Sequence, residues 1–137
     1  MEVRKPYRWH TRVRFVDTDA SQRIHYTAMF RYFEAAEQEF VRELGVSYSA
    51  ETFRDLGFPR VHVECDFLAA IQFDDALEIE VTVARVGASS YTIAFGAYLL
   101  ARLAAKGKIT VVCLDRHTQR SSAIPESLAI ALREHLA

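Results

Sequence analysis

The spacing of apolar residues changes from a strand-like to a helix-like period only once along this chain, which limits the folds open to it. After residue 60, apolar and polar residues alternate in four stretches. These begin at Val61, Leu77, Tyr91 and Ile109 and are separated at Asp74-Asp75, Gly87-Ala88-Ser89 and Ala105-Lys106-Gly107-Lys108. A crossover between parallel strands needs about a dozen residues, so these short connections predict antiparallel neighbours.

One long amphipathic helix is predicted before these strands. Apolar residues recur at helical spacing, and Gly45 follows as a stop signal. The apolar positions are Met29, Phe33, Ala36, Phe40 and Leu44. An earlier strand is expected from Trp9 to Asp17, with Phe15 and Asp17 on the same face as Trp9. A short helix within Val46–Leu56 and a closing helix over Pro125–Leu136 complete an α+β arrangement, in which a curved sheet covers the long helix.

Length and charge exclude several classes of protein. The 137 residues are about the size of one domain, so residues 1–137 are expected to form a single core. With 17 basic and 18 acidic residues the net charge is −1, which argues against a nucleic-acid partner. The sequence shows neither a membrane-spanning apolar run nor a signal-peptide centre, and this predicts a cytoplasmic protein with no membrane partner. Cys65 and Cys113 are expected to be reduced core residues.

Self-association is expected from the strands themselves. Phe95–Leu100 and Val111–Leu114 are apolar on both faces. A single sheet around one helix leaves its outer side and its edge strands exposed. These stretches therefore predict burial against another subunit of the same chain.

The segment from Val16 to Tyr26 combines two carboxylates and an imidazole between a strand end and a helix start. A helix beginning near Tyr26 or Thr27 presents free backbone N–H groups and a positive dipole end, which suit a developing oxyanion. Asp19 would lie beside that end. Taken alone, the segment favours another interpretation, in which Asp17 or Asp19 caps the helix and His25 is a polar surface side chain.

The ordered series Phe15-x-Asp17-Thr18-Asp19-Ala20, Ile24-His25-Tyr26 and Phe30-Arg31-Tyr32-Phe33-Glu34 resembles the hot-dog-fold acyl-CoA thioesterases. The branch is that of 4-hydroxybenzoyl-CoA thioesterase and its YbgC-like relatives. The resemblance runs from about Val13 to Arg116 and includes Phe73-Asp74-Asp75-x-Leu77 and Val86-Gly87-x-Ser89-Ser90-Tyr91. It implies a five-stranded antiparallel sheet around a helix near Tyr26 to Leu44, assembled into dimers or dimers of dimers with the active site between subunits.

The resemblance also assigns roles. It implies that Asp19 is the catalytic carboxylate, either as nucleophile or as general base, and that Asp17 supports it. The Tyr26 N–H would hydrogen-bond the thioester carbonyl, and His25 would line the same pocket. Ser89 or Ser90 would reach the pocket from a neighbouring subunit, although a serine there is also an ordinary turn residue. The reaction would convert acyl-CoA and water into an acid and free CoA, with no metal or redox cofactor.

Two positions depart from the family pattern. Gln22 stands where a glycine is usual, so the bend after Asp19 is expected to differ. Where the aryl-CoA branch carries a basic cluster, this chain has Gly87-Ala88-Ser89, and Arg85 is the nearest cation for CoA phosphates. The other candidate cations, which are expected to be ordinary surface charges, are Arg60, Lys106, Lys108, Arg116 and Arg120.

The remaining polar and aromatic side chains of the helix receive structural interpretations. Glu34 and Glu37 are expected on a solvated helix face. Phe30, Phe33 and Phe58 are expected in the core, with an acyl tunnel beside them as the alternative.

Three other functions are weighed. A haloacid-dehalogenase-type phosphotransferase also places Asp-x-Asp after a strand, but it needs a parallel sheet. A hot-dog hydratase resembles Asp-x-Asn-x-x-His, whereas Thr18-Asp19-Ala20 supplies no asparagine. A protein that binds acyl-CoA without cleaving it stays open.

Overall fold

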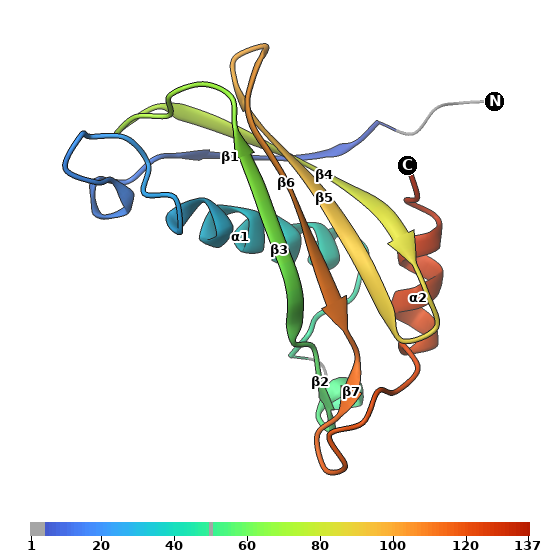
Figure 1. Cartoon of the computed structure of the whole chain (residues 1–137). Helices are drawn as coiled ribbons and strands as arrows, with labels where there is room; N and C mark the ends of the chain where they lie inside the picture. Colours follow the sequence, from blue (N-terminus) through green and yellow to red (C-terminus); the bar gives the residue numbers. More distant parts are fainter. Residues whose placement is uncertain (1–4, 50) are drawn as a thin grey trace.

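Five antiparallel strands form a curved sheet that covers one long helix (Figure 1). The computed structural model describes residues 5–49 and 51–137. The sheet has the order β1-β4-β5-β6-β3 and is made of β1 (Tyr7–Arg12), β4 (Ala76–Val86), β5 (Ser90–Leu99), β6 (Arg102–Val112) and β3 (Arg60–Phe67). The other elements are the 3-10 turns η1 (Phe15–Asp17) and η2 (Glu51–Phe53), the β2–β7 ribbon (Leu56–Gly57 with Leu114–Asp115), and helices α1 (Ala28–Glu43) and α2 (Glu126–Arg133). This confirms the predicted α+β hot-dog architecture and its closing helix.

Helix α1 is buried along the face that its sequence period predicts. Met29, Phe33, Ala36 and Phe40 are fully buried against the sheet, while Leu44 is only partly covered. The Phe33 ring stacks on Phe95 of β5 with centroids 4.7 Å apart. The helix begins at Ala28, slightly later than Tyr26, because residues 25–27 form a separate turn before it.

The first strand is shorter than predicted. It ends at Arg12, and the chain then turns into η1, where the Asp17 N–H donates to the Arg14 carbonyl at 3.0 Å. Phe15 is consequently 73% exposed whereas Asp17 is buried, so the two residues do not share a strand face. A 3-10 turn breaks the two-residue alternation on which the prediction relied.

The last predicted turn is wrong. Residues 105–108 lie inside β6, and the connection from β5 is made at Leu100 and Ala101, with Leu100 in a left-handed conformation (φ 57°). The position of Gly107 within the strand needs glycine, because a Cβ there would lie 2.4 Å from the Glu64 carbonyl oxygen and 2.7 Å from the Phe33 ring. This glycine permits a close approach of helix and sheet rather than marking a bend.

Strand β3 lies at the edge of the sheet and pairs with β6, so it is not the neighbour of β4 that the short connection predicted. Val63 is the cross-strand partner of the buried Ile109 and faces the helix side as expected. The predicted burial of this strand is nevertheless wrong within one protomer. Val61, Val63 and Phe67 are 60%, 46% and 45% exposed on this edge strand. Cys65 is half-buried, Cys113 is buried, and both are free thiols.

Candidate active site

Asp19 is held at the head of a tight turn between η1 and α1. Its N–H donates to the Arg23 carbonyl (2.8 Å), and its own carbonyl accepts from the Gln22 N–H (2.9 Å). Gln22 adopts a left-handed conformation with φ 67°. Glycine adopts this conformation more easily than other residues, so the exposed glutamine stands on a bend that favours glycine. The expected exposed side chain at position 22 is present.

The Asp19 carboxylate is oriented by Ser21. One oxygen, Oδ1, accepts from the Ser21 hydroxyl (2.6 Å) and from the Ser21 N–H (2.8 Å). The hydroxyl bond and then the backbone bond lower the pKa of this carboxyl below its usual value. Asp19 is exposed in the protomer and is therefore ionised at neutral pH. A weaker interaction with the backbone of Arg23 also lowers this pKa. Among the described residues, the side-chain bonds of the carboxylate are to Ser21 and use Oδ1 alone, which leaves Oδ2 for chemistry.

A groove of about 490 Å³ brings Asp19 and Tyr26 together. The segment from Phe67 to Ile71, which continues β3, forms its opposite wall. A hydrogen bond from the Ile24 N–H to the Ile71 carbonyl (2.7 Å) joins the two walls. The Tyr26 N–H has no hydrogen-bond partner among residues 5–49 and 51–137, although the neighbouring His25 and Thr27 N–H groups are both bonded. This N–H lies just before helix α1, where anions are favoured.

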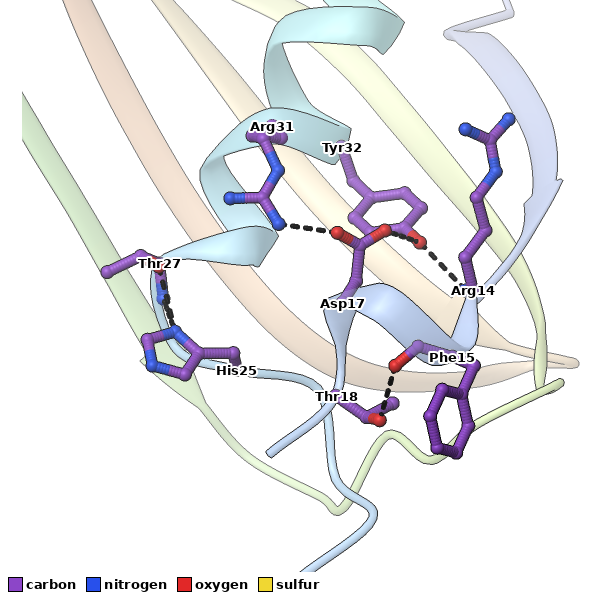
Figure 2. A network of polar contacts seen from close by, with 8 residues as sticks. All are labelled: Arg14, Phe15, Asp17, Thr18, His25, Thr27, Arg31 and Tyr32. Carbon is purple, nitrogen blue, oxygen red and sulfur yellow. Dashed lines mark hydrogen bonds and ion pairs between the residues drawn. The ribbon is translucent and has the colours of Figure 1, made fainter. Parts of the chain in front are cut away.

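His25 organises the start of the helix. Its Nδ1 accepts hydrogen bonds from the Thr27 N–H (3.1 Å) and the Thr27 hydroxyl (2.8 Å), as Figure 2 shows. The imidazole also stacks on the Tyr26 ring, with centroids 4.6 Å apart. Because Nδ1 accepts, the neutral ring carries its proton on Nε2. His25 is thus beside the groove and fixes the segment that presents the Tyr26 amide.

Asp17 anchors the same segment to α1 (Figure 2). Tyr32 donates its hydroxyl to Asp17 Oδ2 at 2.7 Å, and Arg31 donates to Oδ1. Burial raises the pKa of the Asp17 carboxyl, but the bonds from Tyr32 and Arg31 outweigh it and leave the pKa below its usual value. The Tyr32 oxygen in turn accepts from the Arg14 N–H at 3.0 Å. Asp17 therefore joins the turn, the strand exit and the helix.

A second polar cluster lies in the core. Glu37 is fully buried and receives hydrogen bonds from Arg60 and the Tyr48 hydroxyl, both at 2.7 Å. Tyr48 and Tyr91 are also in contact, with their hydroxyl oxygens 2.6 Å apart. The expectations of a solvated Glu37 and a surface Arg60 are therefore wrong, because each supplies the charge that the other needs. Glu34 is exposed, as predicted.

The turn that carries Ser89 and Ser90 lies at the opposite end of the sheet from Asp19. Strand β4 begins beside Arg12 and runs its 11 residues away from the Asp19 turn before the connection to β5. There Arg85 donates to the Ser90 hydroxyl at 2.8 Å. Within one protomer, then, the structure does not bring these three predicted substrate-binding residues to Asp19.

Sequence reasoning missed Arg23 and the apolar wall from Phe67 to Ile71, which line the groove. Arg23 directly follows Gln22, the position where the family usually has glycine, and this departure was the one signal in the sequence that pointed to Arg23. The wall gives no local signal because only the edge position of β3 brings it to Asp19. Among the described residues, no cluster of His, Cys, Asp or Glu side chains has the geometry to hold a metal ion. In the same ranges, no helix combines the length and apolar character that a membrane crossing requires.

The sheet wrapped on one helix, with Asp19 and Tyr26 lining one groove at the helix start, places the protein among hot-dog thioester hydrolases. Residues 13–132 match the Thioesterase-like superfamily, and the chain belongs to that superfamily.

Three known proteins illustrate the relationship. A 1,4-dihydroxy-2-naphthoyl-CoA hydrolase of Prochlorococcus marinus is 27% identical over 124 residues, covering 85% of this chain and 82% of the relative. The acyl-CoA thioester hydrolase YbgC of Escherichia coli is 24% identical over 131 residues, covering 93% and 96%. The solved gentisyl-coenzyme A thioesterase BH1999 superposes with a TM-score of 0.83 at 27% identity, over 92% of this chain and 99% of that one. The predicted membership of the YbgC-like thioesterase family is confirmed.

Proposed function

We propose that this protein hydrolyses acyl-CoA thioesters and that Asp19 and the Tyr26 amide carry the reaction. The observation that carries the proposal is that both line one groove, where Ser21 bonds only Oδ1 of the carboxylate and the amide has no hydrogen-bond partner in residues 5–49 and 51–137. Relatives named as acyl-CoA, naphthoyl-CoA and gentisyl-CoA hydrolases support a CoA thioester as substrate.

The thioester carbonyl is placed against the Tyr26 N–H, so that negative charge forming on its oxygen gains a hydrogen bond and the favourable end of the helix dipole. If Asp19 is a general base, it takes a proton from water as the water oxygen attacks the carbonyl carbon. Collapse of the tetrahedral intermediate then breaks the C–S bond, and the thiolate leaves with that proton. If Asp19 is the nucleophile, the C–S bond breaks as a mixed anhydride forms, and water hydrolyses the anhydride.

His25 has a positioning role in this scheme. Its Nδ1 accepts from Thr27, and its main-chain N–H donates to the Asp17 carbonyl at 2.8 Å. Both bonds hold the peptide that carries the Tyr26 N–H. The orientation of this amide is therefore set before substrate binds, which is the condition for effective oxyanion stabilisation.

The active unit is a homo-oligomer built on the β3 edge. The backbone of β3 is unpaired on one side, and Val61, Val63 and Phe67 are exposed along it. If two β3 edges pair antiparallel, the Arg60 end of one chain meets the Phe67 end of the other. That arrangement turns the β4–β5 connection, with Arg85, Ser89 and Ser90, toward the partner's Asp19 groove. These three residues then contact substrate from the second subunit. One such dimer completes the groove, so the proposal holds equally for a dimer of dimers.

The test is release of free thiol from acetyl-, decanoyl- and benzoyl-CoA by the unmodified chain and by Asp19→Asn. The two proteins are compared at equal folded concentration, as judged by circular dichroism. Asp55→Asn is the matched control, because Asp55 is an exposed carboxylate beside the β2–β7 ribbon and away from the groove. We expect hydrolysis to fall at least 100-fold in Asp19→Asn and to stay within twofold in Asp55→Asn.

Two results would overturn parts of the proposal. Full activity of Asp19→Asn would keep the enzyme class and remove the catalytic residue. No thiol release from any substrate, together with saturable binding of CoA thioesters, would identify a binding protein instead of an enzyme.

A further inference from the structure

The groove that holds Asp19 and Tyr26 has one positively charged side chain in its lining, that of Arg23, within the ranges that the structure describes. The facing wall, from Phe67 to Ile71, is entirely apolar. An exposed arginine opposite an apolar wall is suited to a substrate that is apolar along its length and carries an anionic group. The groove therefore contains a recognition element that hydrolysis itself does not use.

Arg23 has no hydrogen bond or ion pair from its guanidinium to any residue in 5–49 or 51–137. Other arginines of the fold are committed, since Arg31 binds Asp17 and Arg60 binds Glu37. Asp19 is the nearest acid along the turn, but its Oδ1 is occupied by Ser21 and no ion pair joins it to Arg23. The guanidinium thus keeps its full set of donors for a ligand.

The backbone of Arg23 is held rigidly although its side chain is exposed. Its carbonyl accepts the Asp19 N–H at 2.8 Å, and it forms a bridge with Gln72 of the opposite segment. The preceding Gln22 carries the left-handed bend that sets the direction of the chain at this point. The arginine side chain consequently extends from a fixed backbone position in the Asp19 turn, which reduces the entropy lost on binding an anion.

We propose that Arg23 is a specificity-determining residue whose guanidinium binds an anionic oxygen of the thioester substrate. This inference rests on the proposed function and names a chemical class within it. Guanidinium groups bind carboxylate and phosphate oxygens through charge-assisted, often bidentate hydrogen bonds. Two parts of the substrate carry such oxygens: a carboxylate on the acyl group, or the phosphates of CoA.

Four substrates separate the two sources: butyryl and glutaryl thioesters, each on CoA and each on pantetheine, which has no phosphate. KM and kcat are measured for the unmodified chain, Arg23→Gln and Arg23→Lys. Arg133→Gln is the matched control, because Arg133 is an exposed arginine on α2, far from the groove, with no side-chain partner among the described residues. Circular dichroism confirms that the variants are folded.

We expect Arg23→Gln to raise KM about tenfold for the substrates that carry the anionic group and to leave kcat nearly unchanged. This is the result for a contact made equally in the ground state and the transition state. If the anion is on the acyl group, both glutaryl thioesters are affected and neither butyryl thioester is. If it is a CoA phosphate, both CoA thioesters are affected and neither pantetheine thioester is. Arg23→Lys restores part of the loss, and added salt raises KM only while residue 23 is positively charged. KM values within twofold of the unmodified chain for all four substrates would overturn the inference.

A binding measurement separates this inference from the proposed function. The probes are the uncleavable thioethers S-butyl-CoA and S-(4-carboxybutyl)-CoA, titrated by calorimetry into the unmodified chain and Arg23→Gln. Arg23-dependent binding without hydrolysis of any thioester would support the recognition role and overturn the enzymatic one. Hydrolysis with Arg23-independent binding and KM would support the enzyme and overturn the role of Arg23. If the protein neither binds the thioethers nor hydrolyses any thioester, both the proposed function and the role of Arg23 are overturned.

Discussion

The main-chain carbonyl of Asp17 accepts a hydrogen bond from the main-chain N–H of His25 at 2.8 Å, while the Asp17 side chain is bonded to α1. One residue therefore joins both ends of the turn that carries Asp19 and fixes that turn to the central helix. The position of the candidate catalytic groups depends on a buried carboxylate that does not itself face the groove.

Replacing Asp17 with Asn is expected to lower the free energy of unfolding by about 2–3 kcal/mol at pH 7, because charge-assisted bonds to a buried carboxylate are lost. The pKa of this carboxyl is lowered in the folded protein. Its stabilising contribution is therefore complete above the unfolded pKa of about 3.9 and is lost as the pH falls through the lower folded pKa. Urea unfolding from pH 7 to pH 2.5 should show a weaker loss of stability in acid for Asp17→Asn than for the unmodified chain. Equal acid sensitivity would contradict this role.

Replacing Gln22 with Gly is expected to stabilise the protein by about 0.5–1 kcal/mol, since a left-handed backbone costs a side-chain-bearing residue more than it costs glycine. Ala20→Gly is the control in the same turn, because Ala20 does not have a positive φ and should lose stability. Thermal unfolding of both variants gives the comparison. A loss of stability in Gln22→Gly as large as in Ala20→Gly would refute the strain argument.

The Glu37–Arg60 pair is expected to behave as a buried ion pair. Arg60→Met leaves Glu37 without its countercharge and should cost about 3–5 kcal/mol at pH 7. Burial raises the pKa of Glu37, and Arg60, which opposes this effect, is absent in the variant. A raised folded pKa contributes stability below the unfolded value near 4.3 that is lost as the pH rises, so Arg60→Met should be relatively more stable at pH 5 than at pH 7.

The double variant Glu37→Leu/Arg60→Met provides the control for this pair. It removes both charges together and should recover most of the stability lost in Arg60→Met. Denaturant titrations of the single and double variants complete the cycle. Additive losses would show that the two side chains act independently.

Val63→Lys is expected to convert the oligomer to monomers and to reduce thioester hydrolysis, because it places a charge on the apolar side of the free β3 edge. His62→Lys puts the same residue on the opposite face of the strand, where His62 already faces Glu64. Sedimentation equilibrium at micromolar concentration gives the oligomeric state of both variants, and release of free thiol gives their hydrolysis. A stable monomer of the unmodified chain would contradict the shared-groove proposal directly.

The elements with a local pattern were predictable from sequence. Phe33 and Phe40 indicate the buried face of α1 because the helical period repeats within one segment. Asp19 and Tyr26 were found through an ordered series of motifs, and the structure places both in one groove.

The features that were missed depend on residues distant in sequence. Gly107 resembles a turn residue unless the positions of Phe33 and Glu64 are known. Glu37 resembles a surface residue because its countercharge, Arg60, lies 23 positions later. Arg23 lines the groove only because β3 and the segment after it are at the sheet edge.

The edge position of β3 also predicts an order of folding. The chain completes β3 at Phe67, yet the strand that pairs with it, β6, begins only at Arg102, after β4 and β5. The β4–β5 and β5–β6 hairpins have short connections and form contacts at low entropic cost, whereas docking of β3 closes a much longer loop. We expect φ-values near zero for β3 substitutions such as Val63→Ala and larger values in β5, measured by stopped-flow refolding. Since β3 leads into the apolar wall of the groove, we expect the groove to form only after the two hairpins, so that a chain with β4, β5 and β6 already paired still lacks its candidate site.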